Sequence, residues 1–313
     1  MNAKQTLEVE SFDVKANFDQ IYVRPDPREY FRVLHGLDYI IPDLALPIFR
    51  QITETLTGLR GRPLRILDIG CSYGINAAFL RYPMSLERLA QRYGDLQAFG
   101  LAPDEVVALD RNYYRSWPAA INARFIGLDS SAPAVGYATR TGILDHGFAE
   151  DLESNDPSPR LADLLSGVDL VISTGCVGYV TAATFKRVLD AMQTPKPWVV
   201  SFVLRLYPFD EIADVLKERR LVTEKLESVT FVQRRFHSEQ EYSQTLRALQ
   251  AVGVDPQGKE AEGLLHAELF LSRPAEETNA LPLESLVSVT SGASRPFGRR
   301  FQRHADDKIR LVR

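Results

Sequence analysis

The chain has 313 residues, of which 45% are hydrophobic and 25% charged, with a formal net charge of −4 and a pI near 5.8. This length allows one large domain or two small ones, and the composition is ordinary for a soluble globular protein. The mildly acidic balance gives no general attraction to nucleic acid or to an anionic membrane, and no apolar run is long enough to span a bilayer.

The amino terminus and the cysteine content further limit the class of protein. The first residues lack a hydrophobic signal core, so we expect a cytoplasmic protein. Two cysteines, Cys71 and Cys176, are too few for a disulfide framework. The five histidines are scattered, and no cluster has the spacing of metal ligands, so we predict no metal site.

The first 60 residues are predicted to form a helical cap, or lid. Residues 1–23 are polar with isolated aromatics and receive no assignment. Asp26 and Pro27 are typical of a helix start, and this short helix is expected to end at His35 and Gly36. A second helix is expected over residues 43–56, where apolar residues recur at helical spacing, with Gly58 ending it.

Residues 65–74 contain the most informative pattern of the chain. An apolar run predicts a buried strand, and it gives way to a loop with small residues at 70, 72 and 74, followed by a helix over residues 75–81. Glycine lets a ligand approach the backbone closely, and the helix points unpaired N–H groups at the loop. The spacing is not the G-x-G-x-x-G of dinucleotide sites. An ordinary tight strand-to-helix turn is the alternative interpretation.

Regular alternation of strands and helices occupies most of the remaining chain. Two amphipathic helices in an insertion, about residues 83–122, are expected either to cover the crevice beside the loop or to be plain scaffold. Strands are then predicted over the following ranges, with helices between most of them: residues 124–129, 146–151, 169–175, 197–204, the strand-rich 221–236 and 264–271. This pattern favours an α/β fold with a parallel sheet.

The last forty residues differ in character. Residues 274–292 are rich in Glu, Ser and Thr, whereas residues 295–313 contain seven Lys or Arg. A basic tail can contact nucleic acid or acidic lipid, but we expect a solvated tail, or one that packs on a neighbouring subunit of a homodimer. We therefore expect three parts: the cap (1–60), the ligand-binding domain (61–273) and the tail (274–313).

These motifs together resemble class I S-adenosylmethionine (SAM) dependent methyltransferases over roughly residues 60–272. Asp68 followed by small residues at alternate positions is similar to the family's first motif, with Ser72 in place of its middle glycine. The resemblance implies a doubly wound, Rossmann-like, mostly parallel seven-stranded sheet whose last strand runs antiparallel. It also implies SAM as the cofactor.

The resemblance implies a role for each motif. Asp129, followed by Ser130, resembles the second motif, whose carboxylate accepts both ribose hydroxyls; a helix cap is the alternative role. Glu150 and Asp151 resemble the third, where one carboxylate takes the adenine amino group. Residues 169–175 resemble the fourth, under the sulfonium and the methionine arm. The implied SAM-binding residues are Asp68, Gly70, Cys71, Ser72, Gly74, Asp129, Ser130, Glu150, Asp151, Thr174 and Gly175, with Tyr30 and Tyr39 from the cap.

The sequence offers few catalytic candidates. Aromatic rings attract a sulfonium as they do other cations, which singles out Tyr39 and Tyr179; core packing is their alternative role. His35 is a candidate base at the end of the cap helix. We interpret Cys71 and Cys176 as small apolar side chains, since nothing near them indicates a lowered thiol pKa.

Three functions remain open at this stage. The first is a methyltransferase acting on a small molecule, in secondary metabolism by expectation. The second is an enzyme that cyclises SAM itself, because residues 26–31 and 37–42 loosely resemble azetidine-2-carboxylate synthases, which release methylthioadenosine. The third is a SAM-binding partner without catalysis. The sequence does not distinguish them, because all three need the same adenosine site.

Overall fold

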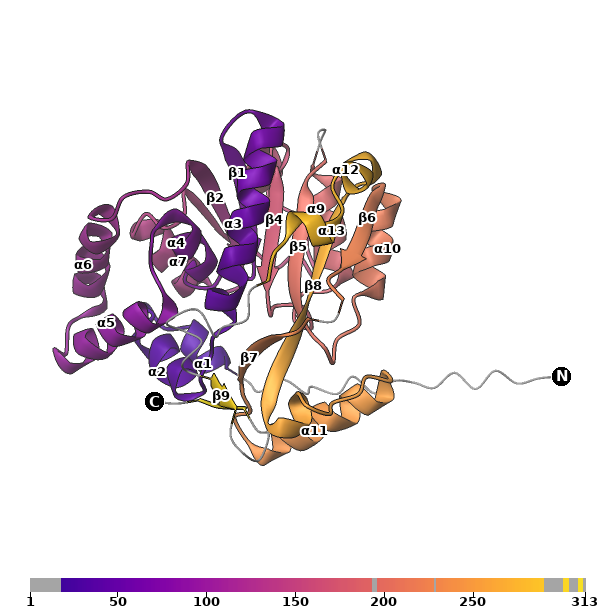
Figure 1. Cartoon of the computed structure of the whole chain (residues 1–313). Helices are drawn as coiled ribbons and strands as arrows, with labels where there is room; N and C mark the ends of the chain where they lie inside the picture. The colour runs from indigo at the N-terminus through magenta and orange to yellow at the C-terminus, as the bar shows by residue number, and fades with distance from the viewer. Residues whose placement is uncertain (1–17, 193–195, 228, 290–300, 304–308, 312–313) are drawn as a thin grey trace.

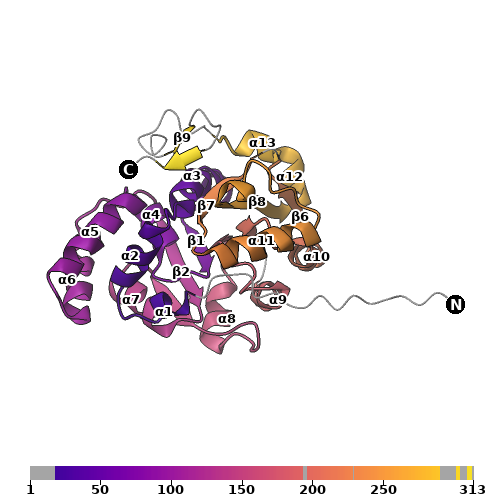
Figure 2. The ribbon, with the colours of Figure 1, turned by 90° about the horizontal axis from the view of Figure 1, so that it is seen from below.

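A single mixed sheet forms the centre of the protein. The computed structural model describes residues 18–192, 196–227, 229–289, 301–303 and 309–311. The strand order in the sheet is β3-β2-β1-β4-β5-β8-β6, and a further strand, β7, pairs with β8. Helices cover both faces of the sheet (Figures 1 and 2).

Five strands run parallel. They are β1 (Leu64–Ile69), β2 (Ala123–Asp129), β3 (His146–Ala149), β4 (Leu170–Thr174) and β5 (Trp198–Leu204). β2 and β3 are added on one side of β1, and β4 and β5 on its other side. β1 lies between β2 and β4 and pairs with both in parallel. The loops after these strands therefore diverge from one point at the carboxyl edge of the sheet, which is where open α/β sheets bind ligands.

The other three strands are antiparallel to their neighbours. β8 (Leu264–Pro274) pairs with β5 on one side and with β6 (Leu221–Lys225) on the other. The order β3-β2-β1-β4-β5-β8-β6, with β8 antiparallel, is that of the class I methyltransferase fold and confirms the predicted fold class. β7 (Phe231–Arg235) is an additional strand, so the strand-rich stretch 221–236 forms two strands on different parts of β8.

The sheet separates two apolar cores, and alternate residues of β1 contribute to each. Leu64 and Ile66 pack with α3 (Ile41–Arg60), α4 (Ile75–Arg81) and α7 (Ala132–Arg140). Leu67 and Ile69 pack on the other face with α8 (Pro159–Leu165), α9 (Ala182–Asp190) and α10 (Asp210–Glu218). Both faces of β1 are therefore covered, as its apolar run predicts. The sequence interpretation did not include α8.

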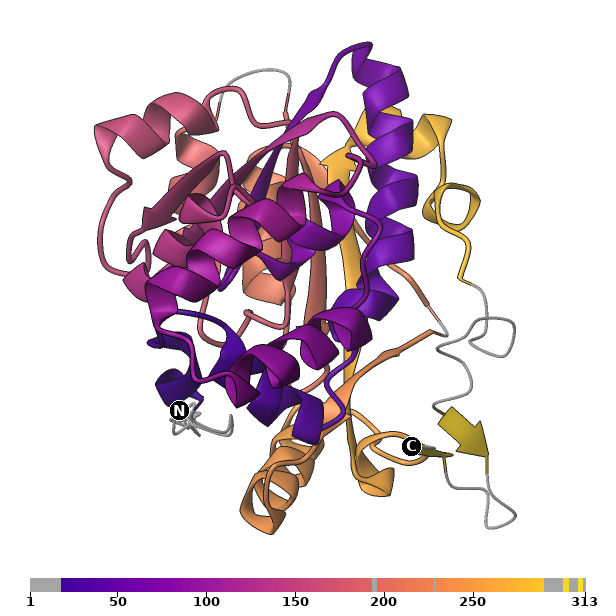
Figure 3. The same ribbon diagram turned by 90° about the vertical axis from the view of Figure 1, so that its left-hand side faces the viewer.

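The insertion is scaffold on the outside of the α2 and α7 layer. Its helices α5 (Leu86–Ala98) and α6 (Pro103–Arg115) contact α2 (Arg28–Gly36) and α7, and they lie at the front in Figure 3. Phe31 of α2 stacks on Tyr93 of α5, with ring centroids 4.7 Å apart. The hydroxyls of Tyr93 and Tyr137 meet the buried carboxylate of Asp110 at 3.2 and 2.6 Å. These contacts anchor the insertion to the core.

The cap differs from its prediction in length and in its partners. α1 (Asp19–Tyr22) precedes α2, and α3 continues past Gly58 to Arg60, where Gly61 ends it in a left-handed conformation. A glycine inside a packed helix costs only about 1 kcal/mol, so Gly58 did not end it. The chain between α2 and α3 pairs with β7: Arg235 N–H donates to the Leu37 carbonyl, and Ile40 N–H to that of Gln233.

The carboxyl-terminal part is more ordered than its composition predicts. α11 (Glu239–Ala251) and the 3-10 turn Glu260–Glu262 join β7 to β8. α12 (Ala275–Ala280) has no buried residue but contacts β6 and β8, and α13 (Leu283–Leu286) buries Leu283 and Leu286 in the main core, so residues 275–286 pack on the domain. β9 (Phe301–Arg303) pairs with β10 (Ile309–Leu311); most of the basic segment 295–313 lies outside the described residues.

None of the helices within the described part of the chain has the length and apolarity needed to cross a bilayer.

Candidate functional site

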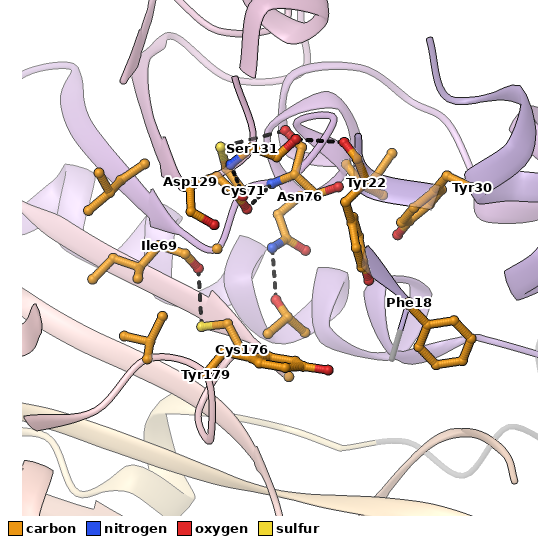
Figure 4. A pocket seen from close by; sticks show the side chains of 18 of the residues that line it. Phe18, Tyr22, Tyr30, Ile69, Cys71, Asn76, Asp129, Ser131, Cys176 and Tyr179 are labelled. Carbon is orange, nitrogen blue, oxygen red and sulfur yellow. Dashed lines mark hydrogen bonds between the residues drawn. The ribbon is translucent and has the colours of Figure 1, made fainter. Parts of the chain in front are cut away.

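A cavity of about 570 Å³ opens at the carboxyl ends of β1, β2 and β4, beneath α1 and α2. That volume is within the usual range for small-molecule sites. Figure 4 shows side chains from the loops after these strands facing Tyr22, Tyr30 and Phe18 of the cap. The cavity is thus closed on one side by the sheet edge and on the other by the cap.

The loop after β1 brings bare backbone to the cavity wall. Gly70 has a φ of +69°, and a Cβ there would lie 2.5 Å from the Cβ of Cys176 in the loop after β4. Glycine is therefore required by both conformation and space. Ser72 follows with a φ of +48°, which is uncommon for a residue with a side chain, and its buried Oγ has no hydrogen-bond partner among the described residues. Ser72 is part of the cavity lining.

Asp129 is held at the end of β2 by two backbone N–H groups. Oδ1 accepts from Ser131 N–H and Oδ2 from Ser72 N–H, each at 2.9 Å. Burial raises the pKa of this carboxyl, while the bonds from Ser131 and Ser72 oppose that shift. Each oxygen keeps a second lone pair. The carboxylate is therefore fixed in orientation and can still accept two hydroxyls from a ligand.

The structure separates the roles of the two acidic residues after β3. The carboxylate of Glu150 accepts from both the N–H and the hydroxyl of Ser158, at 2.9 and 2.7 Å, at the start of α8. Asp151 accepts one local bond at Oδ1, from Glu153 N–H at 2.9 Å. Both residues line the cavity. Glu150 is committed to positioning α8, which leaves Asp151 as the carboxylate better able to meet a ligand.

A buried polar chain runs from β1 to the cavity wall. Asn76 Nδ2 donates to Asp68 Oδ1 at 3.2 Å and to Thr174 Oγ1 at 2.8 Å. Asp68 is fully buried, its Oδ2 has no partner within the described structure, and burial raises its pKa to about 7, against an opposing hydrogen bond from Asn76. Asp68 thus lies behind the lining, whereas Asn76 and Thr174 are part of it.

Tyrosine rings form the cap side of the cavity. Tyr30 makes edge contacts with Tyr39 and Tyr73, with centroids 6.3 and 5.6 Å apart, and Tyr22 lies 5.9 Å from Tyr30. Tyr179, from the loop after β4, lines the mouth and is 49% exposed. Burial raises the pKa of Tyr39 to about 12, so its phenol stays neutral at physiological pH.

The residues around α1 form a strap that is tied to the loops beneath it; we use this name for residues 18–24. Tyr73 directly follows Ser72, and its buried hydroxyl lies 2.7 Å from the Ile21 carbonyl and 2.9 Å from that of Arg24. Ser131 Oγ donates to the Tyr22 carbonyl at 2.6 Å. Both loops that would hold the ligand therefore also hold the strap.

Most of the residues singled out from the sequence meet at this cavity. The predicted residues that line it are Gly70, Cys71, Ser72, Asp129, Ser130, Glu150, Asp151, Thr174, Gly175, Tyr30, Tyr39 and Tyr179. Three others lie outside the lining. Asp68 is behind it, His35 is exposed, and Gly74 makes a left-handed turn where a Cβ would lie 2.8 Å from Ile143, which points to packing between α4 and the α7 region.

Other lining residues escaped sequence reasoning. Ser131 and Asn76 are adjacent to predicted motifs, so a wider reading of the loops would have included them. Phe18 and Tyr22 belong to the aromatics of the unassigned amino-terminal segment. Gln233 and Arg234 come from β7, and nothing in their sequence connects them to the loop after β1. Nor does the lining include any residue of the insertion 83–122, which favours its scaffold interpretation over that of a cover.

Within the described residues, no group of three or more His, Cys, Asp or Glu side chains is arranged to hold a metal ion.

No protein-family model matches the chain, and no curated protein has a significantly similar sequence. Similar solved structures include the plantazolicin methyltransferase BamL in complex with a triazolic desmethylPZN analog and SAH (TM-score 0.42, 14% identity, 82% of this chain and 96% of that one). Magnesium protoporphyrin IX methyltransferase from Synechocystis PCC 6803 with bound SAM has a TM-score of 0.35 and 12% identity, over 83% of this chain and 85% of that one. A TehB-like SAM-dependent methyltransferase from Corynebacterium glutamicum has a TM-score of 0.35 and 14% identity, over 70% of this chain and 85% of that one. Values this low transfer no ligand or activity to this chain.

Proposed function

We propose that the cavity binds SAM and that the protein transfers its methyl group to a small molecule. The observation that carries the proposal is Asp129: a buried carboxylate at the end of β2, oriented by Ser72 and Ser131 N–H groups, with acceptor capacity left for a ribose diol. Gly70 supports it, since the loop beside Asp129 has no room for a side chain. Asp151 also supports it, as a carboxylate in the same lining that can accept a bond from an adenine amino group.

The cap side of the cavity fits the other half of SAM. SAM supplies an electrophilic methyl on a sulfonium, and the ring faces of Tyr30 and Tyr39 are suited to a cation of that kind. Thr174 and Gly175 form the floor at the end of β4. The protein's contribution to methyl transfer is then to exclude water under the strap and to hold the acceptor in line with the methyl group.

A second candidate function uses the same cavity without a second substrate. In it the amine of the aminobutyryl arm attacks its own γ-carbon, the carbon–sulfur bond breaks, and methylthioadenosine leaves with the electron pair. The strap over the cavity fits this candidate, because a substrate that reacts with itself needs no second pocket; Asp68, with a pKa raised to about 7, is buried behind the lining and does not reach the amine. Asn76 connects Asp68 to the cavity wall. A non-catalytic SAM-binding partner would not need a closed cap.

One incubation separates these functions. The pure protein is mixed with SAM alone and with SAM plus a panel of small acceptors, and products are followed by mass spectrometry. Methyl transfer predicts S-adenosylhomocysteine only when an acceptor is present. Methylthioadenosine and a cyclic amino acid from SAM alone would establish the second function and contradict the first. SAM binding without turnover under any condition would contradict both.

A further inference from the structure

Gln233 enters the cavity through an irregularity in β7. The pairing of β7 with β8 shifts register between Val232 and Arg234, so Gln233 is the extra residue of a β-bulge. A bulge turns a side chain away from the regular alternation of a strand and is common beside functional sites. In place of a ladder partner, the Gln233 carbonyl accepts the N–H of Ile40 in the cap. The backbone at Gln233 is thus fixed between β7 and the cap.

The side chain of Gln233 reaches the end of β4. A Cβ at Gly175 would lie 2.5 Å from Gln233 Nε2, so the amide lies directly over the backbone of the β4 loop. Gln233 is only 6% exposed and lines the cavity, yet its Oε1 has no hydrogen-bond partner among the described residues. An unsatisfied buried carbonyl costs about 1–3 kcal/mol, a cost that an N–H donor brought by a ligand would remove.

The charge of the cavity decides which donor is favoured. Its lining contains four carboxylates and one guanidinium; the carboxylates belong to Asp129, Glu150, Asp151 and Glu153, and the guanidinium to Arg234. Arg234 is paired with Glu241 at 2.6 Å, with both side chains buried. Such a cavity repels an anionic acceptor and attracts a cation. The ring faces of Tyr30 and Tyr39 act in the same direction. An amine brings N–H donors and reaches the cavity as a cation, which gives up one proton to water so that its lone pair is free to attack; a carboxylate or phenolate brings neither donor nor positive charge.

We propose that Gln233 makes the enzyme select an amine as its methyl acceptor, with Oε1 accepting an N–H of the neutral amine above the end of β4. The nitrogen lone pair forms the new N–C bond as the S–C bond breaks, S-adenosylhomocysteine keeps the sulfur electron pair, and the methylated ammonium loses its proton to water after release. The inference rests on the proposed methyl transfer, because it places the acceptor nitrogen where the methyl group would be delivered. Gln233 is then the specificity-determining residue of the cap side, and the bulge is the feature of β7 that presents it.

The test uses two ligands that share an adenosine and differ at the methyl position, next to the place proposed for the acceptor nitrogen. Sinefungin carries an amine where SAM carries its methyl group, and S-adenosylhomocysteine carries neither. Their affinities are measured by calorimetry on the full chain for the wild type, Gln233→Leu, Gln233→Glu and the surface control Gln250→Leu. We expect the wild type to prefer sinefungin and Gln233→Leu to lose about tenfold of that preference, with its affinity for S-adenosylhomocysteine unchanged within twofold.

Gln233→Glu keeps the shape of the side chain and adds charge, so we expect it to increase the preference for sinefungin at pH 8. If the leucine variant does not fold, the change in sinefungin preference of Gln233→Glu alone tests the role of Gln233. A preference that stays within twofold of the wild type in the folded Gln233 variants would overturn the role of Gln233 while leaving the adenosine site intact. Failure of the wild type to bind either ligand would instead overturn the proposed function, and with it this inference.

Discussion

At one end of the cavity, Asp129 and Ser72 are positioned by loops that directly follow adjacent parallel strands, so a few residues of local sequence determine their places. At the other end, Tyr30, Tyr39 and Gln233 come from α2, the loop before α3 and a bulge in β7. The first end is part of the sheet's own topology, whereas the second is assembled from distant segments. Substitutions at the first end should therefore affect both folding and binding, and those at the strap mainly binding.

The largest effect is expected on stability, from Asp68→Asn, which lies behind the Asp129 and Ser72 end of the cavity. The folded-state pKa of Asp68 is about 7, above the ordinary value of 3.8, so the stability that this carboxyl contributes is fully present below pH 3.8 and is lost as pH rises through 7. Between pH 5 and pH 8 the wild type should lose about 2–3 kcal/mol of unfolding free energy that Asp68→Asn keeps.

Asparagine can still accept the bond from Asn76, so the polar chain survives the substitution. Urea unfolding at the two pH values measures the difference, with the exposed Asp163→Asn as control. Parallel pH profiles for wild type and Asp68→Asn would show that Asp68 does not titrate in this range.

A smaller effect is expected from Asp129→Ala, also at the first end. The substitution removes a charged acceptor from a ribose diol and should weaken the binding of S-adenosylhomocysteine by roughly 1–3 kcal/mol. Ser72 and Ser131 N–H groups lose their partner as well, so some loss of stability should accompany it. Calorimetry beside Asp163→Ala tests this, and unchanged affinity would remove Asp129 from the site.

The smallest effect is expected where the strap is tied down. Tyr73→Phe removes the hydroxyl that lies near the Ile21 and Arg24 carbonyls, and should weaken S-adenosylhomocysteine binding by about 0.5–1.5 kcal/mol. Tyr82→Phe is the matched control, because Tyr82 is also buried but stacks on Tyr114, away from the strap. If Tyr73→Phe lowered the unfolding free energy and left affinity intact, the strap would belong to the fold rather than to the site.

The same contrast explains what could be predicted from the sequence. The positions of the strands and the residues after β1, β2 and β4 were predictable, because apolar runs mark buried strands and the carboxyl ends of parallel strands meet at one edge. Asp129 and Thr174 follow from that rule alone. Gln233 does not, because a bulge depends on pairing with β8, and pairing over such a distance leaves no local pattern.

The sequence left two roles open for the insertion, a cover over the cavity or plain scaffold. Its amphipathic helices indicated only that they pack on something, and the described contacts place that surface on α2 and α7 rather than over the cavity. The cover is provided by residues 18–24, a segment too short to show a helical pattern in the sequence. Likewise, Gly58 suggested a helix end, although α3 is buried along enough of its length to continue through it.

The central claim is that the cavity is an adenosine site, and a titration of S-adenosylhomocysteine into the wild-type protein tests it most directly. We predict calorimetric binding with one ligand per chain, competition by SAM, and no competition by NAD, since the loop after β1 lacks the dinucleotide spacing. The absence of binding heat over a range of temperatures, together with no ligand-induced rise in Tm, would contradict it.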